Sequence, residues 1–162
     1  MLEVVIAAAL LGVVGLSFAY LYGTSQRFAI QSMNFTSAQG EASYALEHVR
    51  RNLLLATAVA QPPNVAPPGN QTAVLEFTWQ PRSGVPPRTS RYERDGSNRL
   101  LFTPDIADSS VTEIIARSIS AMAFNRAGVS AVSIDMTAQR TSGGDTRTTR
   151  LRTRVSPRGI FR

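Results

Sequence analysis

The chain begins with an almost unbroken run of apolar side chains, from Val4 to Tyr22. About 20 such residues allow a helix to span the ~30 Å hydrocarbon core of a bilayer. A secretory signal peptide would start with basic residues and carry a shorter apolar core, whereas no basic residue precedes Arg27 here. The pattern therefore predicts a retained membrane helix rather than a signal that is removed.

The helical pattern continues beyond the apolar run. No proline occurs before Pro62, and apolar side chains recur at steps of three and four residues, as on one face of an amphipathic helix. These positions are Phe35, Ala38, Ala42, Leu46, Val49 and Leu53. We expect one helix of about 85–90 Å, hydrophobic over 1–24 and amphipathic over 25–60. The sequence leaves open whether it unwinds near Gly12 and Gly15.

A Pro-rich loop at 61–71 is predicted to end the helix. The hydrophobic period then changes from 3.6 to two, which is typical of strands. Leu75, Phe77 and Trp79 fall on one face of the first predicted strand. We expect the rings of Phe77 and Trp79 in the core.

The rest of the chain continues this strand pattern. Residues 88–104 predict a hairpin that turns at Asp95-Gly96, while 111–124 fit either a strand or a short helix. Two further strands, 129–139 and 146–155, are joined by a Gly-rich turn. The positions expected to point inward are Val132, Ile134, Met136, Ala138, Leu151, Thr153 and Val155, and those expected to face solvent are Arg150, Arg152 and Arg154.

These elements together predict an α+β fold. One long N-terminal α-helix packs on a small antiparallel β-sheet, because an antiparallel sheet must bury one of its faces. Residues 61–162 would form the β domain.

The amino-acid composition limits which functional sites the chain can form. The 162 residues contain no Cys, which excludes a disulfide framework and a thiolate metal site. All 17 basic residues are Arg, and the net charge is +6. Much of this charge lies in residues 140–162, where Asp145 is the single acidic side chain. The basicity therefore predicts a charged C-terminal surface.

No catalytic or cofactor-binding residue stands out. His48 is the single histidine, and without a second His, a Cys or a compact acidic cluster it does not predict a metal site. A catalytic base would also need a nucleophile and an orienting group, and the sequence shows neither. We expect His48 on the helix surface, and no metal or cofactor.

The first residues, MLEVVIAAALLGVVG, resemble the N-terminus of type IV pilins and pseudopilins, in which a Glu lies inside a hydrophobic helix. Glu3 occupies that position. In the family this Glu is the fifth residue of the mature chain and a short basic leader precedes it, so either the mature chain begins two residues further upstream or processing differs. More loosely, residues 39–59 and 111–159 are similar to minor pilins and larger pseudopilins.

The resemblance implies a type IV pilin-like structural subunit rather than an enzyme. It would reside in the bacterial inner membrane, be cleaved and methylated by a prepilin peptidase, and be assembled by dedicated machinery into an extracellular or periplasmic homo-oligomeric filament. Such filaments serve adhesion or secretion. Glu3 would pair with the terminal amine of a neighbouring subunit and set the register. The assembly residues implied are Met1, Glu3, Val4, Val5, Ala8, Leu11, Gly12 and Gly15.

Several alternatives remain at this point. Within the family, the chain could be a minor pilin or a type II secretion pseudopilin at a filament tip. Outside it, the chain could be a membrane-anchored module that binds a ligand, or DNA through Arg150, Arg152 and Arg154, although aromatic residues for base stacking do not alternate with these arginines. An anchored enzyme would need a pocket joining His48 and Glu47 to an exposed Ser or Asp.

Two simpler interpretations apply to single residues. Glu3 could be an interfacial side chain on a plain anchor, where the helix dipole favours a carboxylate near the N-terminus. Asn34 and Asn70 each begin a sequence that matches a glycosylation acceptor, a short and common motif.

Overall fold

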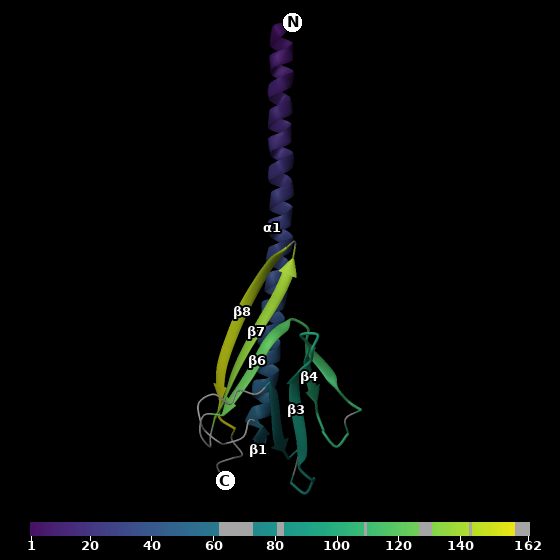
Figure 1. The fold of residues 1–162 in the computed structure, drawn as a ribbon, viewed down its shortest axis with the longest axis vertical. Coiled ribbons are helices and arrows are strands. Elements are labelled where there is room, and N and C mark those ends of the chain that lie inside the picture. Colours follow the sequence, from purple (N-terminus) through teal and green to yellow (C-terminus); the bar gives the residue numbers. More distant parts are fainter. Residues whose placement is uncertain (62–72, 81–82, 109, 127–130, 143, 158–162) are drawn as a thin grey trace. The chain divides into compact units, whose positions relative to one another are not determined.

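The computed structural model describes residues 1–61, 73–80, 83–108, 110–126, 131–142 and 144–157. The chain divides into two compact units, Met1–Thr36 and Ser37–Arg162. The fold is α+β, with a long N-terminal helix and two antiparallel sheets (Figure 1).

Helix α1 runs without a break from Leu2 to Leu54 and so belongs to both units. It remains helical at Gly12 and Gly15, the positions where the sequence left unwinding open. The predicted helix extended to residue 60, and this end is wrong. Ala56–Gln61 form strand β1, because their backbone groups pair with strand β2 and the side chains of Ala56 and Val59 enter the core.

In the part of the chain that the structure describes, eight strands form two sheets, where the sequence predicted one small sheet. Five strands pair in the order β1-β2-β3-β4-β5, and three pair in the order β6-β7-β8. The bounds beyond β1 are β2 Val74–Trp79, β3 Arg88–Arg94, β4 Leu100–Thr103, β5 Glu113–Ala116, β6 Ile119–Arg126, β7 Val132–Ser142 and β8 Asp145–Val155.

A corner between β5 and β6 separates the two sheets. The Glu41 side chain on α1 accepts hydrogen bonds from the backbone N–H of Arg117 (3.1 Å) and from the hydroxyl of Ser118 (3.0 Å). The ambiguous segment 111–124 thus contains two strands with a turn between them, rather than one strand or a helix.

The predicted hairpins are confirmed. The turn between β3 and β4 is organised by Asp95, whose carboxylate accepts hydrogen bonds from the backbone N–H of Ser97 (2.9 Å) and Arg99 (2.8 Å). Strands β7 and β8 pair along their whole length, and Ser142 lies opposite Asp145 at the turn. Gly144 there has a φ of +89°, which side chains other than glycine rarely adopt.

One core joins α1 to both sheets within the second unit. The buried helix side chains begin at Ala38 and continue at three- and four-residue spacing. Four of the six predicted positions are buried, whereas Phe35 and Leu46 are half-buried and Ala45 is buried instead. The predicted inward positions of β7 are all buried. In β8, Val155 is buried, whereas Leu151 and Thr153 are only half-buried. The helix residues buried here are Ala38, Ala42, Ala45, Val49 and Leu53.

Candidate functional site

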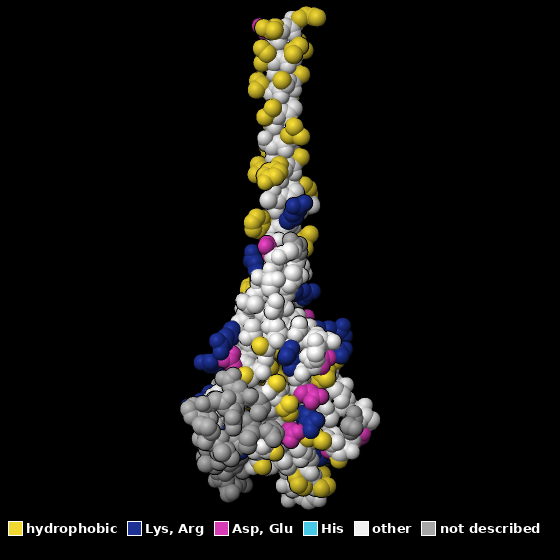
Figure 2. Space-filling view, in the orientation of Figure 1, with side chains coloured by type: hydrophobic (Ala, Val, Ile, Leu, Met, Phe, Trp, Pro, Cys, Tyr) yellow, Lys and Arg dark blue, Asp and Glu magenta, His cyan; other side chains and the backbone are white. Residues whose placement is uncertain are grey.

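The N-terminal part of α1 is apolar and exposed in the single chain. Every residue from Met1 to Gly23 is exposed, and hydrophobic side chains cover this part of the helix (Figure 2). It is the one helix in the described residues that is long and apolar enough to cross a membrane. Because water disfavours exposed apolar surface, this segment is compatible with a membrane anchor.

Glu3 lies in the first turn of this helix. Among the described residues its carboxylate makes neither a hydrogen bond nor an ion pair. Gly12 and Gly15 have open space around the position of a missing Cβ. The chain's own packing therefore does not require glycine there. The predicted assembly residues all lie on this exposed segment.

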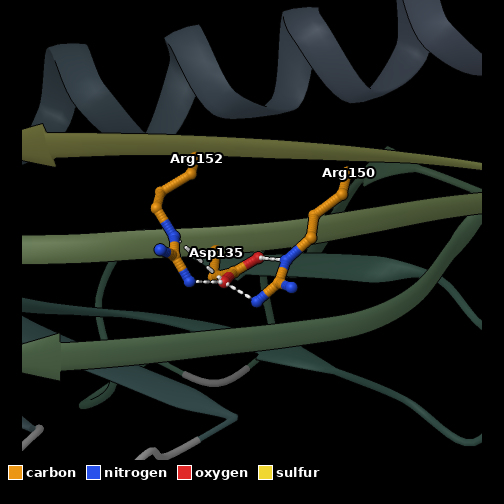
Figure 3. Close-up of polar contacts among 3 residues, drawn as sticks. All are labelled: Asp135, Arg150 and Arg152. Carbon is orange, nitrogen blue, oxygen red and sulfur yellow. Dashed lines mark hydrogen bonds and ion pairs between the residues drawn. The ribbon is translucent and has the colours of Figure 1, made fainter.

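A second cluster lies on the solvent face of the three-stranded sheet, where Asp135 of β7 binds Arg150 and Arg152 of β8 (Figure 3). Arg150 is bidentate, with its Nε 2.7 Å from Oδ1 and its second nitrogen on Oδ2. Nη2 of Arg152 lies 2.8 Å from Oδ2. Hydrogen bonds, first from Arg150 and then from Arg152, hold the pKa of Asp135 at about 2, so it remains ionised at neutral pH.

Positive charge exceeds negative charge on this face. One carboxylate serves two guanidinium groups, and the side chains of Arg150 and Arg152 remain about two-thirds exposed (65% and 68%). Arg154 is exposed and makes no ion pair within the described residues. Beside Asp135 and Arg152, a shallow hollow of about 190 Å³ is lined by Ala123, Asn125 and Ser133. The predicted solvent-facing positions of Arg150, Arg152 and Arg154 are confirmed.

His48 is not the free surface residue that the sequence predicted. Its ring is half-buried, with Nδ1 2.7 Å from the hydroxyl of Tyr92 and the ring edge-on to Phe102 at 5.3 Å between centroids. The Asn52 side-chain amide donates to the same Tyr92 hydroxyl at 2.6 Å. Burial lowers the pKa of His48, Glu113 opposes that shift and Arg51 adds to it.

An aromatic pocket of about 220 Å³ adjoins this histidine. Phe77 is buried as predicted, whereas Trp79 is only half-buried, with its indole N–H donating to Ser90 Oγ at 2.9 Å. The sequence gave no sign of this pocket, because its lining residues come from the end of the helix and from separate strands. The lining residues are His48, Asn52, Leu55, Phe77, Trp79, Phe102 and Pro104.

The remaining predicted sites are less informative. Glu47 pairs with Arg50 and Arg51 on the helix surface and does not line the His48 pocket. Asn34 lies within α1 and is half-buried, and Asn70 lies outside the described residues.

Comparisons with known proteins do not assign the chain to a family. No family model, curated protein or solved structure matches the chain. The chemistry of the two exposed sites must therefore support any functional argument.

Proposed function

We propose that this protein is a structural subunit, a type IV pilin or pilin-like protein, that polymerises through its N-terminal helix into a filament. The observation that supports this most is the exposed apolar helix from Met1 to Gly23, with the unpaired Glu3 carboxylate in its first turn. Before assembly the helix would lie in a membrane, and after assembly it would lie against the helices of neighbouring copies.

The apolar side chains provide the attraction in this proposal. Burying one Val, Leu, Ile or Phe side chain contributes about 1.5–3 kcal/mol. Five such side chains per subunit would therefore contribute on the order of 10 kcal/mol. This attraction is nearly non-directional, so it drives association without selecting one axial offset between neighbouring helices.

Glu3 would select one axial offset between neighbouring helices. A buried carboxylate that loses its partner costs about 3–5 kcal/mol, so offsets that leave Glu3 unpaired are disfavoured. The partner in this proposal is the terminal ammonium group of a neighbouring subunit. Gly12 and Gly15, with open space around them in the single chain, would allow that neighbour's backbone to approach closely.

Assembly of Glu3→Ala tests the proposal. We expect filament yield to fall at least about tenfold, since each 1.4 kcal/mol of lost association free energy is a factor of ten. Yield is measured by electron microscopy and by quantifying sedimented material. Glu3→Asp, which keeps the charge, is the control and should retain much more assembly. Circular dichroism should show both variants folded, because Glu3 makes no hydrogen bond or ion pair within the described residues.

Normal filament yield from Glu3→Ala would contradict the register role. A persistent monomer of the unmodified chain in membranes, with no filament under any assembly condition, would instead favour the anchored binding module. Arg150, Arg152 and Arg154 are the residues that support this second candidate. Two of the three are already bound by Asp135, which weakens it.

A further inference from the structure

The aromatic pocket beside His48 has the size of a one-ring ligand. Its lining comes from the end of α1, from β2, and from β4 and the residue that follows it. A cavity of about 150 Å³ holds benzene, whereas pockets for drug-sized ligands begin at about 300 Å³. The volume of about 220 Å³ lies between these values. The pocket therefore suits a small molecule with a single ring.

Aromatic rings form much of the pocket wall, and their positions are fixed by packing and hydrogen bonding. Tyr92 stacks on Phe77 and on Phe102, with 6.0 and 4.5 Å between the ring centroids. The indole N–H of Trp79 is bound to Ser90 Oγ at 2.9 Å, so it is not available to a ligand. Such a wall offers ring-to-ring contact, which aromatic ligands prefer in offset or edge-on arrangements.

Two polar side chains of α1 also line this pocket. His48 and Asn52 are four residues apart, so they lie on one face of the helix. The Tyr92 hydroxyl occupies Nδ1 of His48 (2.7 Å) and the side-chain nitrogen of Asn52 (2.6 Å). This leaves Nε2 of His48 and the side-chain oxygen of Asn52 for a ligand. In a neutral ring that accepts from Tyr92 at Nδ1, Nε2 carries the proton. The pair then offers one donor and one acceptor.

A hydroxyl group matches this pair, because it donates one hydrogen bond and accepts another. A carboxylate would face the oxygen of Asn52, and an ammonium group would face the N–H of His48. We propose that the pocket binds a small phenol, with its ring against Phe77, Trp79 and Phe102. The phenol oxygen accepts from Nε2 of His48, and its proton is donated to Asn52. This binding would be independent of the proposed filament, because every lining residue lies in the second unit.

The single tryptophan of the chain reports directly on this pocket, because Trp79 lines it. The probe is para-bromophenol, whose bromine atom quenches indole fluorescence on contact. We expect the quenching of Trp79 to saturate, with half-saturation at about 1 mM or below for a ligand of this size. The titration uses the full-length chain in detergent at neutral pH.

Bromobenzene tests the role of the hydroxyl, which it lacks. It should bind about three- to tenfold more weakly than para-bromophenol, the range that one lost hydrogen bond gives. In His48→Phe, which keeps a ring but removes the donor, this difference between the two probes should largely vanish. A merely structural role of His48 would weaken both probes alike and preserve their ratio. Uptake of the probes by detergent cancels when the ratio is compared between chains.

Leu55 allows the pocket itself to be tested without disturbing the core, because it lines the pocket and is 65% exposed. Leu55→Glu should raise the half-saturation concentration about fivefold or more, since a charged side chain replaces apolar contact with the ring. Val111→Glu is the matched control, because Val111 is also exposed (49%) and lies outside the lining. Its titration should match that of the unmodified chain, and circular dichroism checks that each variant is folded.

Three results would overturn the proposal. Quenching that does not saturate, or that Leu55→Glu leaves unchanged, would show that the ring does not enter this pocket. Equal binding of the two probes by the unmodified chain would exclude the phenol assignment, and this comparison depends on no variant. A preference for para-bromophenol that persists in folded His48→Phe would show that His48 is not the donor.

Discussion

At the scale of residues, the Tyr92 hydroxyl organises the junction between helix and sheet. Tyr92 is fully buried, and burial raises the pKa of its phenol well above the ordinary value, so it stays protonated. The Asn52 amide donates to this oxygen, which leaves the phenolic proton for His48 Nδ1. A neutral His48 ring can accept this proton at Nδ1, whereas a protonated ring would have to donate to the same oxygen.

This arrangement predicts a pH-dependent stability. Folding lowers the pKa of His48. As the pH falls below about 6.5, the unfolded chain therefore binds a proton at this residue before the folded chain does, and the free energy of unfolding decreases. The contribution is complete above pH 6.5 and is lost as pH falls through the folded-state pKa. Thermal unfolding between pH 7.5 and 5.5 should show this decline. It should largely disappear in His48→Gln, since the chain has one histidine, and an unchanged slope would exclude this origin.

At the scale of elements, α1 serves two environments with one regular backbone. Its first part is apolar on all sides, whereas the part from Ala38 onward buries a single stripe. Alanines form most of that stripe, which allows the strands to lie close to the helix axis. The helix ends at Leu54 because the following residues gain more from the β1–β2 ladder than from another turn.

Two leucines at the end of α1 provide a matched test of this packing. Leu53 is completely buried and Leu55 is 65% exposed. Leu53→Ala should lower the free energy of unfolding by about 2–5 kcal/mol, because it removes core contacts and leaves a cavity. Leu55→Ala should change it by about 0.5 kcal/mol or less. Urea unfolding measures both, and equal losses would show that the helix end packs differently.

At the scale of the whole molecule, folding and the environment of the apolar helix are separable. The buried core begins at Ala38 and ends at Pro157, so it lies entirely within the unit Ser37–Arg162. No residue before Ala38 is buried in the single chain. The first unit is thus available for lipid or for other copies without loss of the core.

A fragment of residues 37–162 should therefore fold alone. We expect it to be soluble without detergent and to unfold within about 4 °C of the full-length chain, since 1 kcal/mol shifts the unfolding temperature by about that much in a domain between the small and medium size ranges. Light scattering and circular dichroism measure these properties. An aggregated or unfolded fragment would show that residues before 37 complete the core.

The period of the hydrophobic positions and the residues typical of turns made much of this fold predictable. The two-residue period of β7 identified its buried face correctly, and the Asp95-Gly96 and Gly-rich turns identified the hairpins. The same patterns misplaced the end of the helix, because Ala56–Ala60 suit helix and strand alike. They also merged two sheets into one, since the corner at Arg117 and Ser118 depends on Glu41, 76 and 77 positions away.

The sequence by itself determined the apolar helix, the position of Glu3 and the arginine row of β8, because each is a local pattern with a fixed period. Tertiary structure decided that Asp135 binds two of those arginines and that His48 is held by Tyr92. Those features join residues distant in the chain, and a periodic pattern carries no information about which distant strands become neighbours.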